Sequence, residues 1–406
     1  MKKIIRACTV SLSVGFVEGM LPDLTKKYEV VLLSSPGPEM DDAREKYGVR
    51  TIEVPMERHI SLMRDMVSLW RIIKVFWKER PDMVHSMTPK AGLLCMVAGW
   101  LTRVPVRVHT FTGLVFPTAT GLQRRILMAT DALTCFCATH VIPEGEGVKN
   151  DLLNNGITKK PLKVLGYGNV MGIDMKRFDP KRFNGNGNGN VNGNGNGNET
   201  FDFLFVGRIV RDKGMNELMA AFDMLSKKYP QARLVLVGPY EDSLDPVSDE
   251  TRRIIKDNPA IEAVGTKRGD DLLAYYAAAD CFVFPSYREG FPNTVIEAGA
   301  MGLPCIVTDI NGSREIITNE CSVLSVECSE SEKTQNLKLK IKSNGLIIPS
   351  KDAEALYLAM EMMMTDEDMR QRMASCARQM IADRFEQGFV RRCLYDFYDE
   401  IIERER

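Results

Sequence analysis

Residues 286–315 read SYREGFPNTVIEAGAMGLPCIVTDINGSRE, and this stretch decides the fold class of the chain. An apolar run, Cys281 to Pro285, precedes it, and a helix-like segment, Thr294 to Met301, follows a Gly-Phe-Pro-Asn turn. The order predicts a buried strand, a tight loop and the start of a helix. Glu289 would lie in the loop and Glu297 about one turn into the helix, so that both carboxylates can face a common cleft.

Such an arrangement has a chemical use, because helix-start amides bind phosphate and carboxylates accept hydrogen bonds from sugar hydroxyls. The residues alone also fit an ordinary strand-loop-helix connection with solvated acids. A second block lies about eighty residues upstream, where Phe205 to Gly214 contains the pattern Gly-Arg…Lys-Gly. Here Arg208 and Lys213 are the candidate cations, and Gly207 precedes the first of them.

With these two blocks in this order, the chain resembles the retaining glycosyltransferases of family 4. The resemblance covers most of the chain and implies an α/β protein of the GT-B fold. In that fold two Rossmann-like domains face each other across a cleft, and a last helix crosses back to the first domain. The expected domains are 1–178 on the acceptor side, a flexible Asn/Gly-rich loop at 179–200, a nucleotide-sugar-binding domain at 201–384, and the returning helix at 385–406.

The resemblance also implies roles for residues. Arg208 and Lys213 would hold the nucleotide diphosphate, Glu289 would orient the sugar hydroxyls, Glu297 would bind the ribose, and His109 would lie near the transferred sugar. The expected catalytic residues are therefore Glu289, His109, Arg208 and Lys213. The expected donor-binding residues are Gly15, Gly207, Arg208, Lys213, Gly265, Lys267, Glu289, Gly290, Phe291, Pro292, Asn293, Thr294 and Glu297.

Candidate acceptor residues lie in the first half of the chain. His85 and His109 each occur at a predicted strand end, where an open α/β sheet lines its cleft. A lone histidine is more often a satisfied structural residue. Arg124 and Arg125 would suit an acceptor phosphate, although simple surface charges fit them as well.

Charge is divided unevenly along a chain that is almost neutral overall. Residues 1–180 hold 25 Lys and Arg against 18 Asp and Glu, and the remainder holds 28 against 36. A basic first half suits an anionic acceptor or membrane surface, while a chance surplus is about as good an explanation. Residues 61–77 mix apolar and basic side chains. A helix packed on the sheet is favoured over a membrane-lying one, because the apolar positions cover a wide arc.

Other features set limits on function. The ten cysteines show no zinc or disulfide spacing, which indicates reduced thiols and a cytoplasmic protein. The start MKKIIRACTV is interpreted as a buried strand, and no apolar run is long enough to span a bilayer. Asp366-Glu-Asp368 has the form of a manganese motif but fits a helix start, so neither a metal nor another cofactor is expected. Residues 184–198 are expected to be a flexible spacer, and 322–342 a surface insertion.

The expected function is transfer of a hexose or N-acetylhexosamine from a nucleotide sugar to a lipid-diphosphate-linked saccharide in bacterial surface polysaccharide synthesis. UDP is the expected nucleotide, and GDP-mannose is the weaker candidate. No nucleic acid partner is expected, whereas peripheral contact with the inner face of the membrane is. Two alternatives remain: a UDP-sugar 2-epimerase on the same scaffold, and a non-catalytic nucleotide-sugar-binding protein.

Overall fold

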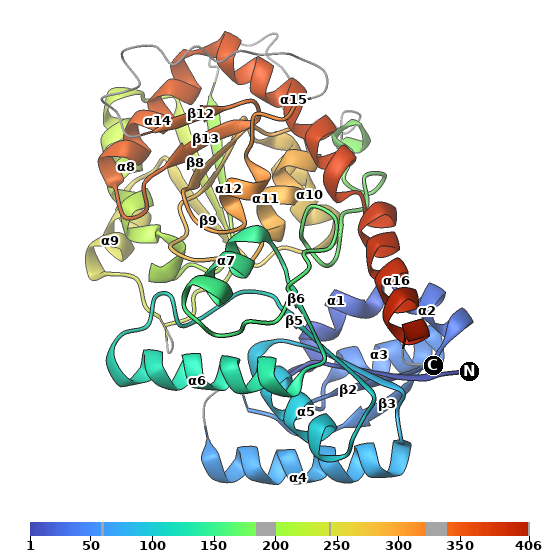
Figure 1. Cartoon of the computed structure of the whole chain (residues 1–406). Helices are drawn as coiled ribbons and strands as arrows, with labels where there is room; N and C mark the ends of the chain where they lie inside the picture. Colours follow the sequence, from blue (N-terminus) through green and yellow to red (C-terminus); the bar gives the residue numbers. More distant parts are fainter. Residues whose placement is uncertain (58–60, 184–199, 243–244, 322–338, 405–406) are drawn as a thin grey trace. The chain divides into compact units, whose positions relative to one another are not determined.

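The structure is a computed structural model, and it describes residues 1–57, 61–183, 200–242, 245–321 and 339–404. The expected spacer at 184–198 and most of the expected insertion at 322–342 lie outside these residues. The chain forms two compact units (Figure 1). Unit 1 contains Met1–Gly172 and Gln387–Arg406, and unit 2 contains Ile173–Glu386.

Unit 1 is built on a six-stranded parallel sheet with the order β3-β2-β1-β4-β5-β6. Its strands are β1 (Lys3–Ala7), β2 (Glu29–Ser34), β3 (Arg50–Glu53), β4 (Met83–Met87), β5 (Val106–Phe111) and β6 (His140–Pro143). Its helical segments are η1 (Ser11–Val14), α1 (Gly15–Glu18), α2 (Leu21–Lys27), α3 (Pro38–Tyr47), α4 (Leu62–Glu79), α5 (Pro89–Leu101), α6 (Gly121–Cys137), α7 (Glu146–Asn154) and α16 (Gln387–Arg404).

Each face of this sheet carries its own apolar core, because strands buried on both sides are apolar almost throughout. One core joins the sheet to α4, α5 and α6, with α5 packed between the other two helices (Figure 1). The other core includes Val17, Leu21 and Met40 from α1, α2 and α3, together with Tyr398 and Ile401 from α16. The last helix therefore completes the core of unit 1, which confirms its expected return.

Helix α4 meets the sheet along a narrow stripe. Ser68, Ile72 and Phe76 are buried, whereas most of the other apolar side chains on the helix stay exposed. The prediction that this helix packs on the sheet is confirmed. The wide arc of apolar residues on this helix is nevertheless only partly explained by the core. The rest of the arc is an apolar surface that faces outward beside the buried stripe.

Unit 2 repeats the architecture with a seven-stranded sheet of order β12-β13-β11-β10-β7-β8-β9, in which β12 runs antiparallel to β13. Its strands are β7 (Phe201–Val206), β8 (Ala232–Val237), β9 (Ile261–Gly265), β10 (Cys281–Phe284), β11 (Cys305–Thr308), β12 (Lys340–Lys342) and β13 (Gly345–Ile348). Its helical segments are η2 (Pro180–Phe183), η3 (Arg211–Lys213), α8 (Met215–Lys228), α9 (Asp249–Asp257), α10 (Gly269–Ala278), α11 (Asn293–Ala300), α12 (Ser313–Ile316), α14 (Ala353–Thr365) and α15 (Glu367–Phe385).

Local sequence explains where several of these helices begin. Asp352 and Asp366 accept hydrogen bonds from the amides of Ala355 and Met369, both at 2.9 Å, and so cap α14 and α15. The Asp366-Glu-Asp368 motif therefore marks a helix start. Among the described residues no cluster of three or more Asp, Glu, His or Cys side chains is arranged to hold a metal ion.

Both sheets contain one point where the strand order reverses. In unit 1 the first strand, β1, lies between β2 and β4, and in unit 2 the first strand, β7, lies between β8 and β10. In open parallel sheets ligands bind outside the carboxyl ends of the strands at this point, since the loops on its two sides turn in opposite directions. The fold thus marks one candidate binding edge in each unit.

Candidate active site

The site in unit 2 is built where β7 and β10 end side by side. Strands β7 and β10 are neighbouring parallel strands, with Cys281 aligned with Phe203. The loop after β7 carries Lys213, and the loop after β10 carries Glu289. The two sequence blocks that carry the family resemblance therefore meet at the reversal point of the sheet.

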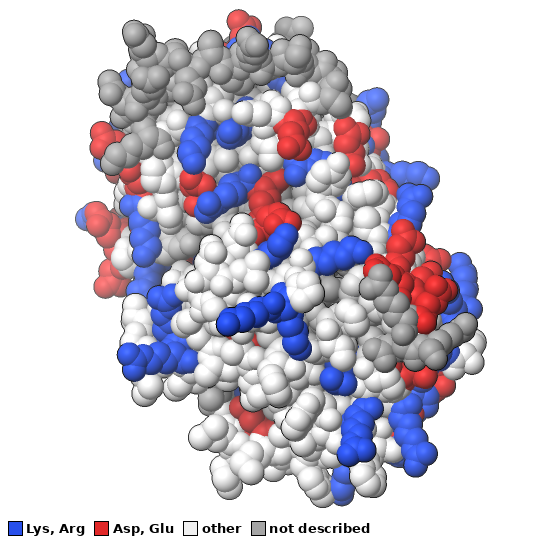
Figure 2. Space-filling view, viewed as in Figure 1, with Lys and Arg blue, Asp and Glu red and all other residues white. Residues whose placement is uncertain are grey.

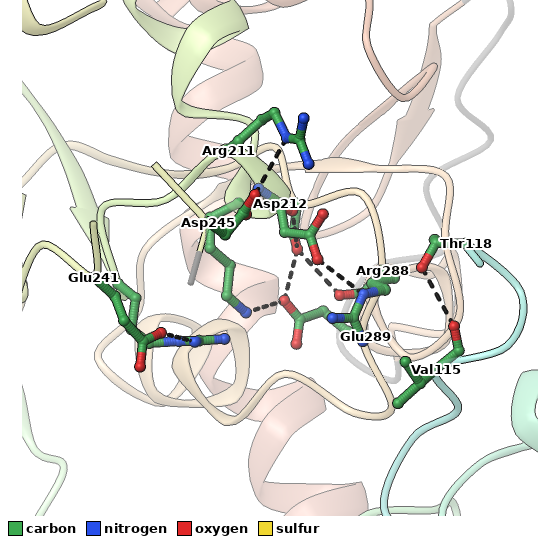
Figure 3. A network of polar contacts seen from close by, with 11 residues as sticks. Val115, Thr118, Arg211, Asp212, Glu241, Asp245, Arg288 and Glu289 are labelled. Atoms are coloured by element: carbon green, nitrogen blue, oxygen red, sulfur yellow. Dashed lines mark hydrogen bonds and ion pairs between the residues drawn. The ribbon is translucent and has the colours of Figure 1, made fainter. Parts of the chain in front are cut away.

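Lys213 and Glu289 form an ion pair through Nζ and Oε1 (Figure 3). Both side chains are largely buried, with 15% and 16% of their areas exposed. The same Glu289 oxygen accepts a hydrogen bond from Ser286 Oγ at 2.6 Å, and the Lys213 ammonium lies 5.1 Å from the centre of the Phe284 ring. These contacts hold one carboxylate and one ammonium group in fixed positions beside the strand ends.

Asp212 connects the two loops that carry this pair. Its carbonyl accepts from the Tyr287 amide at 2.9 Å, and its carboxylate accepts from Arg288 Nε at the same distance. Gly214 adds a close approach, since a Cβ atom there would lie 2.0 Å from the Pro285 carbonyl oxygen and its φ is +71°. Glycine is required at this position by both the space and the backbone conformation.

Arg208 has a different partner from the one expected. Its guanidinium pairs with Glu241, which Figure 3 shows to one side of Glu289, and about half of the Arg208 side chain is exposed. Arg211 pairs likewise with Asp245 at 3.2 Å. Each of the four cations that follow β7 or β10 here has an acidic partner, so the cluster carries little net charge; the pairs are Arg208–Glu241, Arg211–Asp245, Lys213–Glu289 and Arg288–Asp212.

Glu297 lies in α11 and is held by a residue of α10. The Tyr276 hydroxyl, itself buried, donates to Glu297 Oε2 at 2.9 Å. Burial disfavours the charged carboxylate and raises the pKa of Glu297 to about 7, although the hydrogen bond from Tyr276 opposes this shift. Glu289 and Glu297 therefore have separate partners, and their environments differ.

The loop between the two glutamates is fixed by packing. The Phe291 ring is buried and lies 5.4 Å from the ring of Phe385, so only the backbone of Phe291 remains for a donor. Gly290 faces Gly312, where a Cβ atom would lie 2.4 Å from the Gly290 carbonyl oxygen. Of the other expected contacts, Pro292 is buried, and Asn293 and Thr294 are half-buried at the start of α11.

The remaining donor candidates of unit 2 lie along the same edge. Gly207 follows β7, and Gly265 ends β9, with φ of +70° and a carbonyl that accepts from the Gly238 amide at 2.9 Å. Lys267 follows two residues later and is half-buried. These positions extend the candidate site from β10 across β7 and β8 to β9.

In unit 1 the structure places His85 in the core. His85 is 1% exposed, its Nδ1 lies 2.7 Å from Arg6 Nη1, and its Nε2 lies 2.7 Å from Thr110 Oγ1. The Tyr398 hydroxyl of α16 approaches Nδ1 at 2.6 Å. Burial and the neighbouring Arg6 charge lower the pKa of His85. Both ring nitrogens therefore have partners inside unit 1, and the acceptor role expected for His85 stays a prediction.

His109 is also buried, at 1% exposure, and burial lowers its pKa to about 3. Its Nδ1 lies 2.9 Å from Ser86 Oγ. The ring packs edge-on against Phe111 and so close to α5 that a Cβ atom at Gly92 would lie 2.3 Å from its Cε1. The imidazole is therefore neutral and tightly enclosed. Its expected position near the sugar stays a prediction.

The other candidates of unit 1 are less constrained. Arg124 donates to Asn155 Oδ1 at 2.8 Å, whereas Arg125 is exposed on α6. Gly15 starts α1 with a right-handed backbone, and a Cβ atom there would meet nothing within 4 Å. Gly15 is therefore not required by local packing.

Sequence reasoning missed the residues that support the candidates. In unit 2 these are Ser286 and Asp212 inside the two motif blocks, Tyr276 in α10, and Glu241 in the loop after β8. In unit 1 the reversal point carries a threonine pair, with Thr9 Oγ1 2.7 Å from Thr88 Oγ1. Thr88 has a φ of +72°, an unusual conformation for a β-branched residue. No sequence signal identifies that strain.

Two family models match the chain. "Glycosyl transferases group 1" matches residues 190–380, and "Glycosyl transferase 4-like domain" matches residues 21–168. Together they cover more than three quarters of the chain, and they divide it between the two units. The chain belongs to the family-4-like, group 1 glycosyltransferases. The prediction of the family is thus confirmed.

Relatives agree with this assignment. The chain is 29% identical over 404 residues to the capsular polysaccharide biosynthesis glycosyltransferase CapM of Staphylococcus aureus, covering 99% of this chain and 98% of that protein. It is 28% identical over 306 residues to the Escherichia coli UDP-Gal:alpha-D-GlcNAc-diphosphoundecaprenol alpha-1,3-galactosyltransferase, covering 74% and 76%. Named glycosyltransferases thus match along most of the length of this glycosyltransferase.

Solved structures confirm the GT-B fold. The Anabaena protein HepE, solved with UDP and glucose, superposes with a TM-score of 0.72 at 16% identity and covers 98% of this chain and 100% of its own. A UDP-N-acetylglucosamine 2-epimerase superposes less well, with a TM-score of 0.55 at 15% identity. The epimerase scaffold is related, but the transferases are nearer.

Proposed function

We propose that this glycosyltransferase moves a hexose or N-acetylhexosamine, with retention of configuration, from a UDP-sugar to a lipid-diphosphate-linked saccharide. The observation that carries the proposal is the Lys213–Glu289 pair at the strand-order reversal of unit 2. It joins the two motifs of a donor site at the place where open α/β sheets bind ligands. The full-length similarity to a capsular glycosyltransferase supports the same direction.

On the donor side, Lys213 and Arg208 bind the diphosphate and stabilise the negative charge that develops on it as the sugar leaves. Lys213 acts as a compact point charge, and Arg208 offers a planar fork to phosphate oxygens. For this role Arg208 exchanges Glu241 for phosphate. No metal or other cofactor enters the proposal; the positive groups that face the diphosphate in it are Arg208 once it leaves Glu241, the Lys213 ammonium and the amides at the start of α11.

On the sugar side, Glu289 accepts hydrogen bonds from the sugar hydroxyls and Glu297 from the ribose. The base lies toward Gly265 and Lys267, at the end of β9. During transfer the bond from the anomeric carbon to the diphosphate breaks on the face where the acceptor oxygen bonds, and the acceptor proton passes to the leaving phosphate. Glu289 positions the sugar and forms no covalent intermediate in this scheme.

On the acceptor side, we propose a lipid-linked saccharide diphosphate at the cytoplasmic face of the membrane. The name of the Escherichia coli relative contains an acceptor of this class, and a Campylobacter jejuni relative that is 24% identical over 336 residues is named for another undecaprenol-diphosphate substrate. Arg124 and Arg125 are the candidate phosphate contacts, and His109 is the candidate at the sugar. No helix in the described part of the chain is long and apolar enough to cross a bilayer.

A donor panel tests the proposal. The purified full chain is incubated with UDP-sugars and GDP-mannose, with and without a polyprenyl-diphosphate sugar in detergent, and both nucleotide release and the lipid product are measured. A transferase releases nucleotide and extends the lipid only when the acceptor is present. An epimerase changes the UDP-sugar alone, and a binding protein changes neither, so either result would contradict the proposal.

A further inference from the structure

The outer face of α4 has an unusual composition. Every exposed residue of this helix is either apolar or basic. Six are large apolar side chains between 48% and 80% exposed, namely Leu62, Met63, Met66, Val67, Trp70 and Trp77. Such residues are normally scattered singly over a protein surface, so their gathering on one helix face indicates an interaction site.

The acids of α4 are turned inward and paired. Asp65 pairs with Lys90 at 2.7 Å. Glu79 is 8% exposed and pairs with Lys3 at 3.0 Å and Arg50 at 2.8 Å. The outward face therefore presents no carboxylate of this helix, although the helix contains two.

The exposed basic residues lie among the apolar ones. Arg71, Lys74 and Lys78 are exposed on α4, and the Lys74 ammonium lies 3.4 Å from the centre of the Trp70 ring. Arg64 is exposed as well and pairs with Glu57 of the preceding segment. Lysine and arginine stems can lie along an apolar surface while their charged ends reach outward.

The last turns of α5, which packs on α4, and of α6, which packs on α5, also carry exposed apolar side chains. Trp100 and Leu101 of α5 are 48% and 51% exposed, and Phe136 of α6 is 66% exposed. The Trp100 and Phe136 rings lie 6.2 Å apart. In Figure 2 white and blue atoms predominate over the part of unit 1 that carries α4 and α6.

We infer that the outer face of α4 docks unit 1 onto an anionic lipid bilayer. Tryptophan and other large apolar side chains favour the interface between headgroups and acyl chains, and interleaved basic residues favour anionic headgroups. A protein partner would need an apolar surface with matching acids over the length of an 18-residue helix, whereas an anionic leaflet supplies both features everywhere. The docking of α4 onto a bilayer is inferred without the proposed function. The proposed function enters only as the reason for docking, which is access to a lipid-linked acceptor.

Vesicle flotation of the full chain tests this surface. We expect binding to vesicles of equal parts phosphatidylglycerol and phosphatidylcholine, and much weaker binding to phosphatidylcholine alone. The double variant Trp70→Ser/Trp77→Ser should lose about tenfold in affinity for the anionic vesicles, because it removes two interfacial aromatic side chains. Met224→Ser, which changes an exposed apolar residue of α8, is the control and should bind like the parent.

A charge pair provides the second arm. Arg71→Gln/Lys74→Gln should weaken binding to the anionic vesicles by about tenfold, since each basic residue near an anionic leaflet contributes to binding. Arg253→Gln/Lys256→Gln, which removes two exposed charges from α9, should leave the affinity unchanged. Thermal melting confirms that each variant is folded.

The outcomes separate this inference from the proposed function. If the parent ignores anionic vesicles but still extends an acceptor in detergent, the docking surface is wrong and the transferase proposal survives. If the chain binds anionic vesicles as expected but uses no nucleotide-sugar donor, the transferase proposal is wrong and the docking surface survives. Sedimentation without lipid tests whether a second copy of the chain covers this face instead. A dimer that dissociates in the Trp70→Ser/Trp77→Ser variant would assign the face to a second copy and overturn the membrane assignment.

Discussion

The two units share the strand order around their reversal points but use their polar residues differently. In unit 2 the residues chosen from sequence, Lys213 and Glu289, leave adjacent strand ends and contact each other. In unit 1 the chosen histidines, His85 and His109, are both 1% exposed and serve internal contacts. Opposite charges in two loops that start at neighbouring strand ends attract each other and form an ion pair. A neutral imidazole on a central strand is instead buried, because the strand is covered on both faces.

The strongest test of this difference is Glu289→Gln. The amide keeps the size of the side chain but loses the charge that pairs with Lys213, so we expect the fold to survive and kcat to fall about a hundredfold. Steady-state nucleotide release measures the effect. Glu361→Gln is the matched control, because Glu361 pairs with Lys228 at 2.8 Å on the surface of unit 2. Near-normal turnover in Glu289→Gln would contradict the site.

The corresponding change in unit 1 is His85→Ala, and its expected effect is on stability. It removes a neutral partner of the buried Arg6 guanidinium and leaves a cavity beside Thr110, which should lower the free energy of unfolding by about 2 kcal/mol. Denaturant unfolding measures this. The fraction that remains folded should keep its donor affinity. A variant of normal stability with lost turnover would assign His85 to the site after all.

The contribution of Glu297 to donor binding can be distinguished from that of Glu289 by its pH dependence. Because the pKa of Glu297 is raised to about 7, its carboxylate is increasingly protonated below that value and accepts fewer ribose hydrogen bonds. We expect the affinity for an intact UDP-sugar, whose phosphates unlike the terminal phosphate of UDP do not titrate in this range, to fall about tenfold from about pH 7.5 to about pH 6, as for a single proton. Calorimetric titration of the parent and of Glu297→Gln tests this, since the variant should lack the step.

Tyr276 sharpens the same experiment. Its hydrogen bond favours the charged form of Glu297, so Tyr276→Phe should raise the pKa of that carboxyl and move the step to higher pH. Protonation of Glu297 affects the stability of the fold in the opposite direction to its effect on ribose binding. Because the folded-state pKa of Glu297 lies above its ordinary value of 4.5, this group stabilises the fold at low pH, and the contribution is lost as the pH rises through about 7. An unchanged step in Tyr276→Phe would show that another group titrates.

The smallest expected effect concerns Arg208. Its partner Glu241 competes with a diphosphate for the guanidinium, and an exposed ion pair of this kind is worth at most about 1 kcal/mol. Glu241→Gln should therefore tighten UDP binding by about threefold. Asp242→Asn, which instead releases Arg252, is the neighbouring control and should have no effect. Weaker UDP binding in Glu241→Gln would indicate that the ion pair itself positions Arg208.

The comparison also shows how far sequence reasoning reaches. The fold class and the family could be predicted from the two motif blocks, and the resemblance implied both the return of the last helix and a shared donor site for Lys213 and Glu289. The ion pair between these two side chains was not predicted, because the sequence assigned them to different parts of the donor. The environment of Glu297 could not be predicted either, since it depends on Tyr276 from another helix. Nor could the burial of His85, which depends on α16, more than three hundred residues later in the chain.

Helix α16 also constrains the order in which the two units can fold during synthesis. Its side chains Tyr398 and Ile401 belong to the same apolar core as β1 and β2, so unit 1 lacks part of its interior until these residues have been synthesised. Unit 2, although it is encoded later than the start of unit 1, has all of its residues by Glu386. On the ribosome the second unit can therefore finish folding before the first, the reverse of the usual N-terminal-first order.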